Sequence, residues 1–213
     1  MRSARGSEPA PPVPPRVGIL AIQGDVEAHG RALGRLGARV VPVLREKDLD
    51  GLAALILPGG ESTTISKGMD RLRLWEPLRE FACSGRPLLV TCAGAILLAR
   101  SAQRPPVPTL GLLDLVAVRN AYGTQVDSFA RPVDPGCAPG LEGLRCVFIR
   151  APRLSQPGPQ VEVLARVQGH PVLVRQGCVL AATFHPELTP DLRVHRLLLD
   201  GAAAWPAPDG SAT

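Results

Sequence analysis

The amino-acid sequence predicts an α/β protein with a mostly parallel central sheet, helices on both faces and additional antiparallel strands in the C-terminal half. Three observations lead to this prediction. In the first hundred residues, apolar segments of strand length alternate with segments of helical periodicity. Those apolar segments are continuous rather than alternating, as in parallel strands that are buried on both faces. After about residue 110, short strand-like segments follow one another with turn residues between them.

The first half of the chain supplies the expected parallel strands and their helices. Residues 17–22 and 39–44 are predicted strands, and Pro42 favours a sheet edge for the second. Between them, Asp25 is a candidate N-cap for an amphipathic helix that ends at Gly37. The other elements predicted in this half are a strand running into a glycine turn over 52–63, a helix over 71–84, a strand over 86–91 and a helix over 93–100.

The second half is predicted to form a meander or hairpins laid against the parallel sheet. Its expected strands cover 115–119, 144–150, 161–167, 170–176 and 178–184, and a final helix covers about 190–204. The length suffices for one sizeable core. We therefore expect a single domain over 16–204, preceded by a disordered proline-rich leader over 1–15 and followed by a flexible tail over 205–213.

Composition argues against several classes of function. The net charge of +5 is scattered and aromatic residues make up 3%, whereas nucleic-acid sites need clustered charge and stacking rings. No apolar stretch approaches the roughly 18–20 residues of a membrane helix, and no apolar segment follows Arg2 and Arg5 as a secretory signal requires. The five cysteines form no CxxC pair, which speaks against a disulfide framework or a zinc site and fits a reducing cytoplasm.

Cys92 lies at the junction of a predicted strand and a predicted helix. Such a junction is a nucleophile elbow, which lifts a side chain above the strand end and aims the following backbone N–H groups at the same space. The N-terminus of the helix favours the thiolate form of a cysteine. The small residues Ala93 and Gly94 let the turn close. The alternative is a buried structural cysteine.

The sequence FHPE places His185 and Glu187 two positions apart at the end of an apolar strand. In an extended chain, residues i and i+2 point to the same side, so Glu187 is expected to accept a hydrogen bond from one imidazole nitrogen. The other nitrogen is then free to take a proton from Cys92. This is the arrangement of a Cys–His–acid triad, in which the base activates the nucleophile and the acid orients the base.

The sequence LPGGEST provides a glycine loop after a predicted strand. Glycines tolerate unusual backbone angles and close approach to a ligand. The N–H of Gly60 is therefore expected to pair with the N–H of Ala93 as an oxyanion hole. Glu61 and Ser62 would then face a polar substrate. The alternative is a tight turn in which Ser62 is the N-cap of a helix.

A glycine loop, an elbow cysteine and a late His-x-Glu, in this order, resemble the triad-type class I glutamine amidotransferases, whose fold is flavodoxin-like. More narrowly, the sequence is similar to the family of glutaminase subunits of pyridoxal 5'-phosphate synthases. GGESTT together with FIRAP is specific to this narrower family, whereas the triad alone indicates the superfamily. The segments that carry the likeness are LAIQGDVEAHG (20–30), LPGGESTT (57–64), TCAGAILLA (91–99), GLLDLVAVRNAYGTQVDSF (111–129), VFIRAP (147–152) and FHPELT (184–189).

The resemblance implies roles for individual residues. Cys92 would be the nucleophile, His185 the base and Glu187 its partner. The residues implied to bind glutamine are Gly59, Gly60, Glu61, Ser62, Arg119, Ile149 and Arg150. An arginine also suits the α-carboxylate of L-glutamine on chemical grounds.

The resemblance also implies partners. Neither a metal nor an organic cofactor is implied. In this family, the ammonia passes within a hetero-oligomeric complex to a separate synthase subunit. That subunit builds pyridoxal 5'-phosphate, a form of vitamin B6, from a pentose phosphate and a triose phosphate.

The sequence departs from the family pattern in places. Val90 stands where the elbow usually has glycine, and NAYGTQ over 120–125 replaces the commoner Asn-Ser-Phe-Gly-Arg-Gln. The proline-rich leader has no family counterpart. We interpret His29, His170 and His195 mainly as structural residues, with a structural or interface role for His29.

Three alternatives remain open on the sequence. The first is a glutaminase subunit serving another synthase, such as that of histidine biosynthesis. The second is a cysteine peptidase or esterase on the same scaffold. The third is a non-catalytic interaction subunit.

Overall fold

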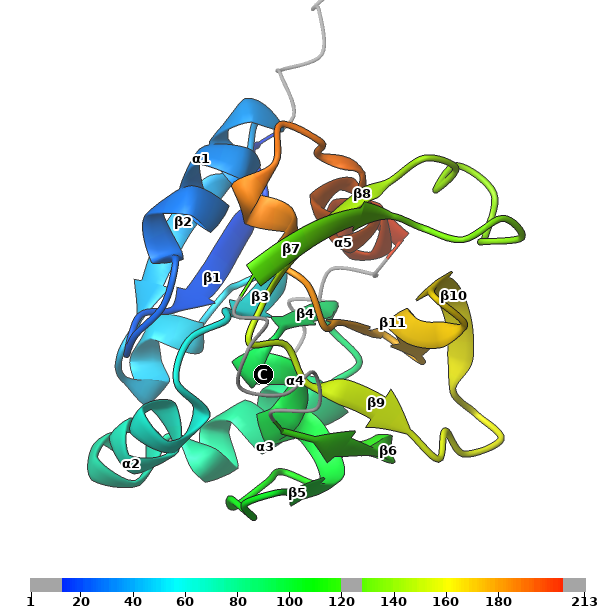
Figure 1. Cartoon of the computed structure of the whole chain (residues 1–213). Helices are drawn as coiled ribbons and strands as arrows, with labels where there is room; N and C mark the ends of the chain where they lie inside the picture. The colour runs from blue at the N-terminus through cyan, green and yellow to red at the C-terminus, as the bar shows by residue number, and fades with distance from the viewer. Residues whose placement is uncertain (1–12, 120–127, 205–213) are drawn as a thin grey trace, which may run out of the picture.

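A seven-stranded sheet forms the centre of the computed structural model, which describes residues 13–119 and 128–204 (Figure 1). Its strands are β1 (Arg16–Leu20), β2 (Arg39–Val43), β3 (Ala54–Leu57), β4 (Leu88–Thr91), β10 (Glu162–Val167), β11 (His170–Gln176) and β12 (Val179–Ala182). They lie in the order β10-β11-β12-β4-β3-β1-β2. The five strands from β12 to β2 are parallel to one another. Strand β11 runs antiparallel to both of its neighbours, β10 and β12. The predicted fold class is confirmed, as is the edge position of the strand that contains Pro42.

Helices cover both faces of this sheet (Figure 1). Helices α2 (Ser62–Leu72), α3 (Trp75–Cys83) and α4 (Ala93–Leu98) pack on one face, and α1 (Val26–Arg35) and α5 (Arg193–Ala204) pack on the other. Within β3, Leu55 and Leu57 join the first core and Ala54 and Ile56 join the second, because successive side chains of a strand point to opposite faces. Burial on both faces explains why the strands are apolar throughout.

The remaining strands form two smaller sheets. Strands β5 (Ala99–Gln103), β6 (Leu113–Val118) and β9 (Arg153–Ser155) make one, and β7 (Ser128–Pro132) and β8 (Arg145–Ile149) make the other. The predicted meander corresponds to β10, β11 and β12, which pair antiparallel with one another and extend the main sheet. The sequence analysis missed β5, β7 and β9. Of these, β5 follows α4 without a turn signal and β9 is only three residues long.

The helix predicted over 71–84 corresponds to α3 (Trp75–Cys83) and begins too early, and helix α2 (Ser62–Leu72) before it was not predicted. Helix α2 ends at Leu72, and Arg73 has a left-handed backbone with a φ of 55° before α3 begins at Trp75. The indole Nε1 of Trp75 donates a hydrogen bond of 2.6 Å to Oδ1 of Asp70, which fixes the corner. The apolar spacing continues across this break, so periodicity alone could not reveal it.

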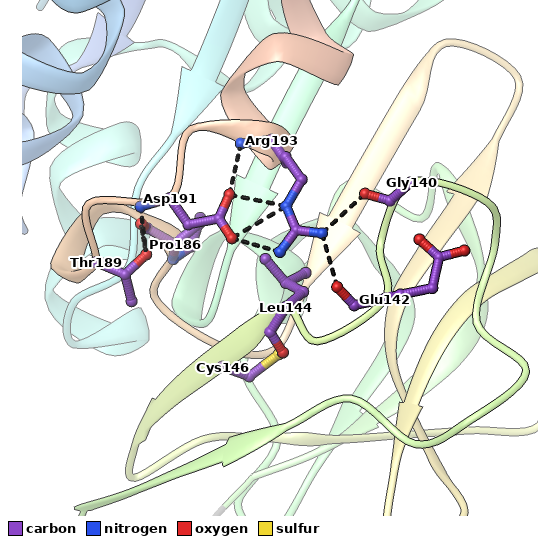
Figure 2. A network of polar contacts seen from close by, with 8 residues as sticks. All are labelled: Gly140, Glu142, Leu144, Cys146, Pro186, Thr189, Asp191 and Arg193. Atoms are coloured by element: carbon purple, nitrogen blue, oxygen red, sulfur yellow. Dashed lines mark hydrogen bonds and ion pairs between the residues drawn. The ribbon is translucent and has the colours of Figure 1, made fainter.

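Arg193, at the start of α5, forms hydrogen bonds with the loop before β8 (Figure 2). Its guanidinium lies 2.6 Å from Oδ2 of Asp191, and it donates hydrogen bonds of 2.9 and 3.0 Å to the backbone carbonyls of Gly140 and Glu142. These contacts hold in place the chain that links β12 to α5.

Three of the sequence predictions concern residues outside the described ranges. These are the leader predicted over 1–15, of which residues 1–12 lie outside, the tail over 205–213 and the NAYGTQ segment over 120–125. Within the described ranges, each helix is too short or too polar to span a membrane.

Candidate active site

Cys92 sits at a strained turn between β4 and α4. Its φ of 45° and ψ of −101° are rare for a residue other than glycine. Its backbone N–H donates a hydrogen bond of 2.8 Å to the carbonyl of Ala182, so the turn is tied to the end of β12. A Cβ at Gly94 would overlap the carbonyl oxygen of Leu57, so glycine lets α4 approach the end of β3. The backbone therefore has the form of the expected elbow.

His185 and Glu187 are in direct contact. Nδ1 of His185 lies 2.7 Å from Oε1 of Glu187, and both side chains are buried, with exposures of 6% and 0%. The geometric reason given by the sequence was wrong, because β12 ends at Ala182 and Glu187 lies in the 3-10 turn η2 (Pro186–Leu188). The two side chains meet across that turn instead of along an extended strand. The backbone N–H of His185 also donates to the carbonyl of Val147 at 2.8 Å, so β8 helps to place the imidazole.

The surroundings of His185 favour its protonated form. Burial by itself lowers the pKa of the imidazole, but hydrogen bonds with Cys92 and Glu187 and the charges of these groups outweigh it and raise the pKa to about 10. The imidazole therefore keeps a proton at neutral pH. A protonated imidazole beside a thiol can stabilise a thiolate and can later give its proton to a leaving group.

The thiol and the imidazole open into a cavity of about 280 Å³, close to the lower end of roughly 300 Å³ for small-molecule sites. It lies at the carboxyl ends of the parallel strands, where open α/β sheets bind ligands. The residues that line it are Gln23, Gly24, Asp25, Gly60, Glu61, Ser62, Cys92, Ile96, Arg119, Ile149, Arg150 and His185. Of the predicted site residues, Gly59, Ala93 and Glu187 are not part of this lining.

The glycine loop packs against the Cys–His pair. A Cβ at Gly59 would overlap the imidazole of His185 and would lie 3.2 Å from Cβ of Cys92. On the other side, a Cβ at Gly24 would overlap the carbonyl oxygen of Gly59. Gly60 has a φ of 153°, which L-residues rarely adopt. Glycine at these positions is thus what brings the loop against the site.

Glu61 caps α2 and contacts Arg119. Its carboxylate accepts backbone hydrogen bonds of 3.0 Å from Thr63 and 2.6 Å from Thr64, so Glu61 rather than Ser62 is the N-cap. Partial burial raises the pKa of Glu61, but hydrogen bonds from Thr64 and Thr63 lower it to about 2 overall. Nη2 of Arg119 lies 3.5 Å from Oε1 of Glu61. Glu61 and Arg119 thus place a negative and a positive charge side by side in the cavity lining.

Gln23, Gly24, Asp25 and Ile96 line the cavity but were not predicted as site residues. Oε1 of Gln23 accepts a hydrogen bond of 2.9 Å from the backbone N–H of Glu61, so it holds the glycine loop. Asp25 is at the N-cap position of α1, but its side chain makes no cap hydrogen bond with a described residue, and Oδ2 lies 3.9 Å from Nδ1 of His185. The signal that could have found Gln23 and Asp25 is their place after the first strand, at the sheet edge that carries Cys92.

Asp25, His185 and Glu187 are the one group among the described residues that could hold a metal ion, with ligand atoms within 4.8 Å of one another. However, Nδ1 of His185 and Oε1 of Glu187 already share a hydrogen bond. The donor atoms are thus arranged to orient an imidazole rather than to surround a cation.

The fold is that of class I glutamine amidotransferases. A solved structure described as a glutamine amidotransferase matches with a TM-score of 0.82 and 47% identity, and the match covers 88% of this chain and 99% of that chain. The model of the SNO glutamine amidotransferase family matches residues 19–203, so this chain belongs to that family.

Curated relatives agree with this assignment. The pyridoxal 5'-phosphate synthase subunit PdxT of Frankia alni is 52% identical over 190 residues, which cover 87% of this chain and 94% of the relative. The protein of the same name from Deinococcus radiodurans is 49% identical over 189 residues, which cover 86% of this chain and 95% of the relative. The family resemblance seen in the sequence is confirmed.

Proposed function

We propose that this chain is the glutaminase subunit of a pyridoxal 5'-phosphate synthase, which hydrolyses L-glutamine and passes the ammonia to a synthase subunit. The observation that carries the proposal is the elbow thiol of Cys92, which opens into a small polar cavity beside His185, itself held by Glu187 at 2.7 Å. The narrower function is supported by relatives named as subunits of that synthase at about half sequence identity.

In the first half of the reaction, the thiolate of Cys92 attacks the side-chain amide carbon of glutamine. The electron pair of the carbonyl moves onto oxygen, and the N–H groups of Gly60 and Ala93 stabilise the oxyanion. His185 gives its proton to the amide nitrogen as the carbon–nitrogen bond breaks. Ammonia leaves, and the glutamyl group stays on Cys92 as a thioester.

In the second half, His185 is neutral and takes a proton from a water molecule whose oxygen attacks the thioester. The same N–H groups stabilise the second oxyanion. When this intermediate collapses, the carbon–sulfur bond breaks, glutamate leaves and Cys92 returns to the thiolate. The proton given to ammonia is thus regained from water, and these steps need no metal or organic cofactor.

The charges in the cavity match the backbone groups of glutamine. Arg119, with a side chain only 12% exposed, is suited to the α-carboxylate, and Glu61 is suited to the α-ammonium group. The carbonyl of Ile149 lies 3.8 Å from Sγ of Cys92, where it can accept a hydrogen bond from the amide nitrogen of the substrate. Gly59, Ser62 and Arg150 complete the proposed binding residues.

We place the reaction in the cytoplasm, as part of a hetero-oligomeric complex with the synthase subunit. All five cysteines lie in the described ranges and are free thiols, which suits a reducing compartment.

Glutamate formation from glutamine, measured with and without the synthase subunit, tests the proposal. Cys92→Ala should reduce turnover to background because the thioester cannot form, whereas Cys83→Ala, at an exposed thiol away from the cavity, should keep full activity. A glutamine analogue that alkylates thiols should label Cys92. Labelling mainly at another cysteine, or hydrolysis of peptides or esters instead of glutamine, would overturn the proposal. Stimulation only by the synthase of another pathway would refute the narrower function.

A further inference from the structure

Two buried histidines lie directly behind the candidate triad. His29 of α1 and His195 of α5 are both 0% exposed, and Nδ1 of His29 lies 2.9 Å from Nε2 of His195. The other ring nitrogen of His29, Nε2, lies 3.4 Å from Oε2 of Glu187 and 3.5 Å from Oγ1 of Thr91. The pair therefore connects two helices on one face of the sheet to the carboxylate that holds His185.

Both histidines are held in the neutral form. Burial, followed by the neighbouring His195 and His185, lowers the pKa of His29 well below its ordinary value, and burial lowers the pKa of His195 to about 4. A neutral imidazole carries a proton on one of its two nitrogens only. The partners of each nitrogen therefore decide which one is protonated.

These partners give the hydrogen bonds one direction. Oε2 of Glu187 can only accept, and it makes no hydrogen bond with a described residue at its present separation of 3.4 Å from Nε2 of His29. An N–H at that nitrogen would be the donor that lies near it. With the proton of His29 on Nε2, this nitrogen faces Oε2 of Glu187 and Oγ1 of Thr91, and Nδ1 accepts a hydrogen bond from Nε2 of His195. The opposite tautomer would turn a lone pair toward a buried carboxylate oxygen, which is costly because a buried charged group is left unsatisfied.

We propose that His29 and His195 are positioning residues for the catalytic base. His29 holds Oε2 of Glu187, so that Oε1 stays on Nδ1 of His185 and Nε2 of His185 faces Cys92. His195 fixes the tautomer of His29. This inference rests on the proposed function of Cys92, His185 and Glu187. It means that helices α1 and α5 also contribute to the orientation of the imidazole of His185.

His29→Leu and His29→Gln separate this role from a packing role. Leucine fills the space without an N–H, whereas the amide nitrogen of glutamine can reach the place of Nε2. We expect His29→Leu to lower kcat by up to about 100-fold at an unchanged KM for glutamine, as a misplaced catalytic group does. His29→Gln should recover most of this loss. His170→Leu, on β11 and outside the cavity lining, is the matched control and should be neutral.

The pH profile gives a readout that packing alone would not change. The titratable groups around His29 are Glu187, His185 and His195. Asp25 lies one contact further away, 3.9 Å from His185. If Glu187 leaves its position, its hydrogen bond no longer supports the proton on His185. The alkaline limb of the activity profile should then move to lower pH in His29→Leu. Alkylation of Cys92 by iodoacetamide, which needs only the thiolate, should become slower at neutral pH because a less basic His185 stabilises the thiolate less. An unchanged profile with wild-type kcat would refute the proposal.

A double-mutant cycle tests whether His29 acts through Glu187. In a Glu187→Gln background, His29→Leu should cost little further activity, and a full independent loss would contradict the proposal. If His29→Leu does not fold, His29→Asn replaces it, because the shorter asparagine amide cannot reach the place of Nε2. Should the wild-type chain not hydrolyse glutamine, the proposed function fails, but the alkylation profiles of Cys92 still decide whether His29 positions His185.

Discussion

At the scale of single residues, the elbow depends on the absence of a side chain at Gly94. A Cβ there would overlap the backbone oxygen of Leu57, which cannot move aside as a flexible side chain could. We expect Gly94→Ala to lower the free energy of unfolding by about 1–3 kcal/mol, as overpacking does, and to reduce activity because the turn at Cys92 shifts. Chemical denaturation and glutamate formation measure the two effects.

Gly34 is the matched control for this substitution. It lies in α1 on the exposed side, and no described atom lies within 4 Å of the position that a Cβ would take. Alanine should therefore raise the free energy of unfolding by about 0.5–1 kcal/mol, since it restricts the unfolded chain and suits a helix. A destabilised Gly34→Ala, or a Gly94→Ala of wild-type stability and activity, would show that the contact at Gly94 has been misjudged.

The triad residues should differ in how much activity each carries. His185→Ala removes the group proposed as both base and acid, whereas Glu187→Gln keeps the imidazole and should degrade its orientation. In another triad hydrolase, loss of the base costs roughly 10⁶-fold in kcat and loss of the acid roughly 10⁴-fold, and we expect the same order here. Steady-state kinetics on folded variants measure it. A fully active His185→Ala would end the triad model.

Local motifs explain why the sequence identified some site residues and not others. Cys92 stands at a strand–helix junction and His185 and Glu187 are two positions apart, so each signal lies within a few residues. The contact of His29 with Glu187 joins positions that are distant in sequence. His29 lies on the apolar stripe of a helix, and this position in the sequence does not distinguish a packing role from a role in positioning a carboxylate.

At the scale of elements, Arg193 connects α5 to the loop before β8 (Figure 2). We expect Arg193→Gln to lower the free energy of unfolding by about 1–2 kcal/mol, a figure reduced for screening because about a third of the side chain is exposed. Arg196→Gln, at an exposed position of the same helix, should change it by no more than about 0.5 kcal/mol. Equal effects of the two substitutions would contradict this role.

The pH dependence of this contact has a definite sign. Hydrogen bonds from Arg193 lower the pKa of Asp191 below its ordinary value. The folded chain therefore holds this carboxylate ionised where the unfolded chain starts to protonate it, so the contribution is present above the ordinary pKa and is lost as pH falls through the folded pKa. The difference between wild type and Arg193→Gln should shrink in that acidic range.

The sequence predicted most elements of the first half and fewer of the second. Parallel strands buried on both faces are apolar throughout, and this pattern does not depend on their neighbours. After residue 110, β7 and β9 were missed and the other strands were found. Their partners were not predicted, because the pairing of β12 with β4 depends on contacts between distant parts of the chain. The break at Arg73 was not predicted because α2 and α3 both bury an apolar stripe, so the apolar spacing continues from one helix to the next.

At the scale of the whole molecule, the buried histidine pair sets the response to acid. His29 and His195 are neutral in the folded chain and have an ordinary pKa near 6.5 when exposed. Below that pH the unfolded chain binds more protons, so the free energy of unfolding should fall as the pH falls, with a slope that approaches about 1.4 kcal/mol per unit for each histidine toward pH 5. Denaturation between pH 5 and 6.5 measures this slope, and His195→Gln should reduce it. An unchanged slope would show that His195 is not neutral in the folded protein.

Because β12 comes late in the sequence, the residues that follow it are synthesised well after Cys92. Cys92 leaves the ribosome long before His185 and Glu187, which follow a strand that pairs with β4. A chain truncated after residue 176 should therefore carry the thiol but hydrolyse no glutamine, and activity in such a chain would contradict this reasoning. With the proposed roles, an unfinished polypeptide has a nucleophile without its base, so ammonia release is expected only after the segment that follows β12 has been made.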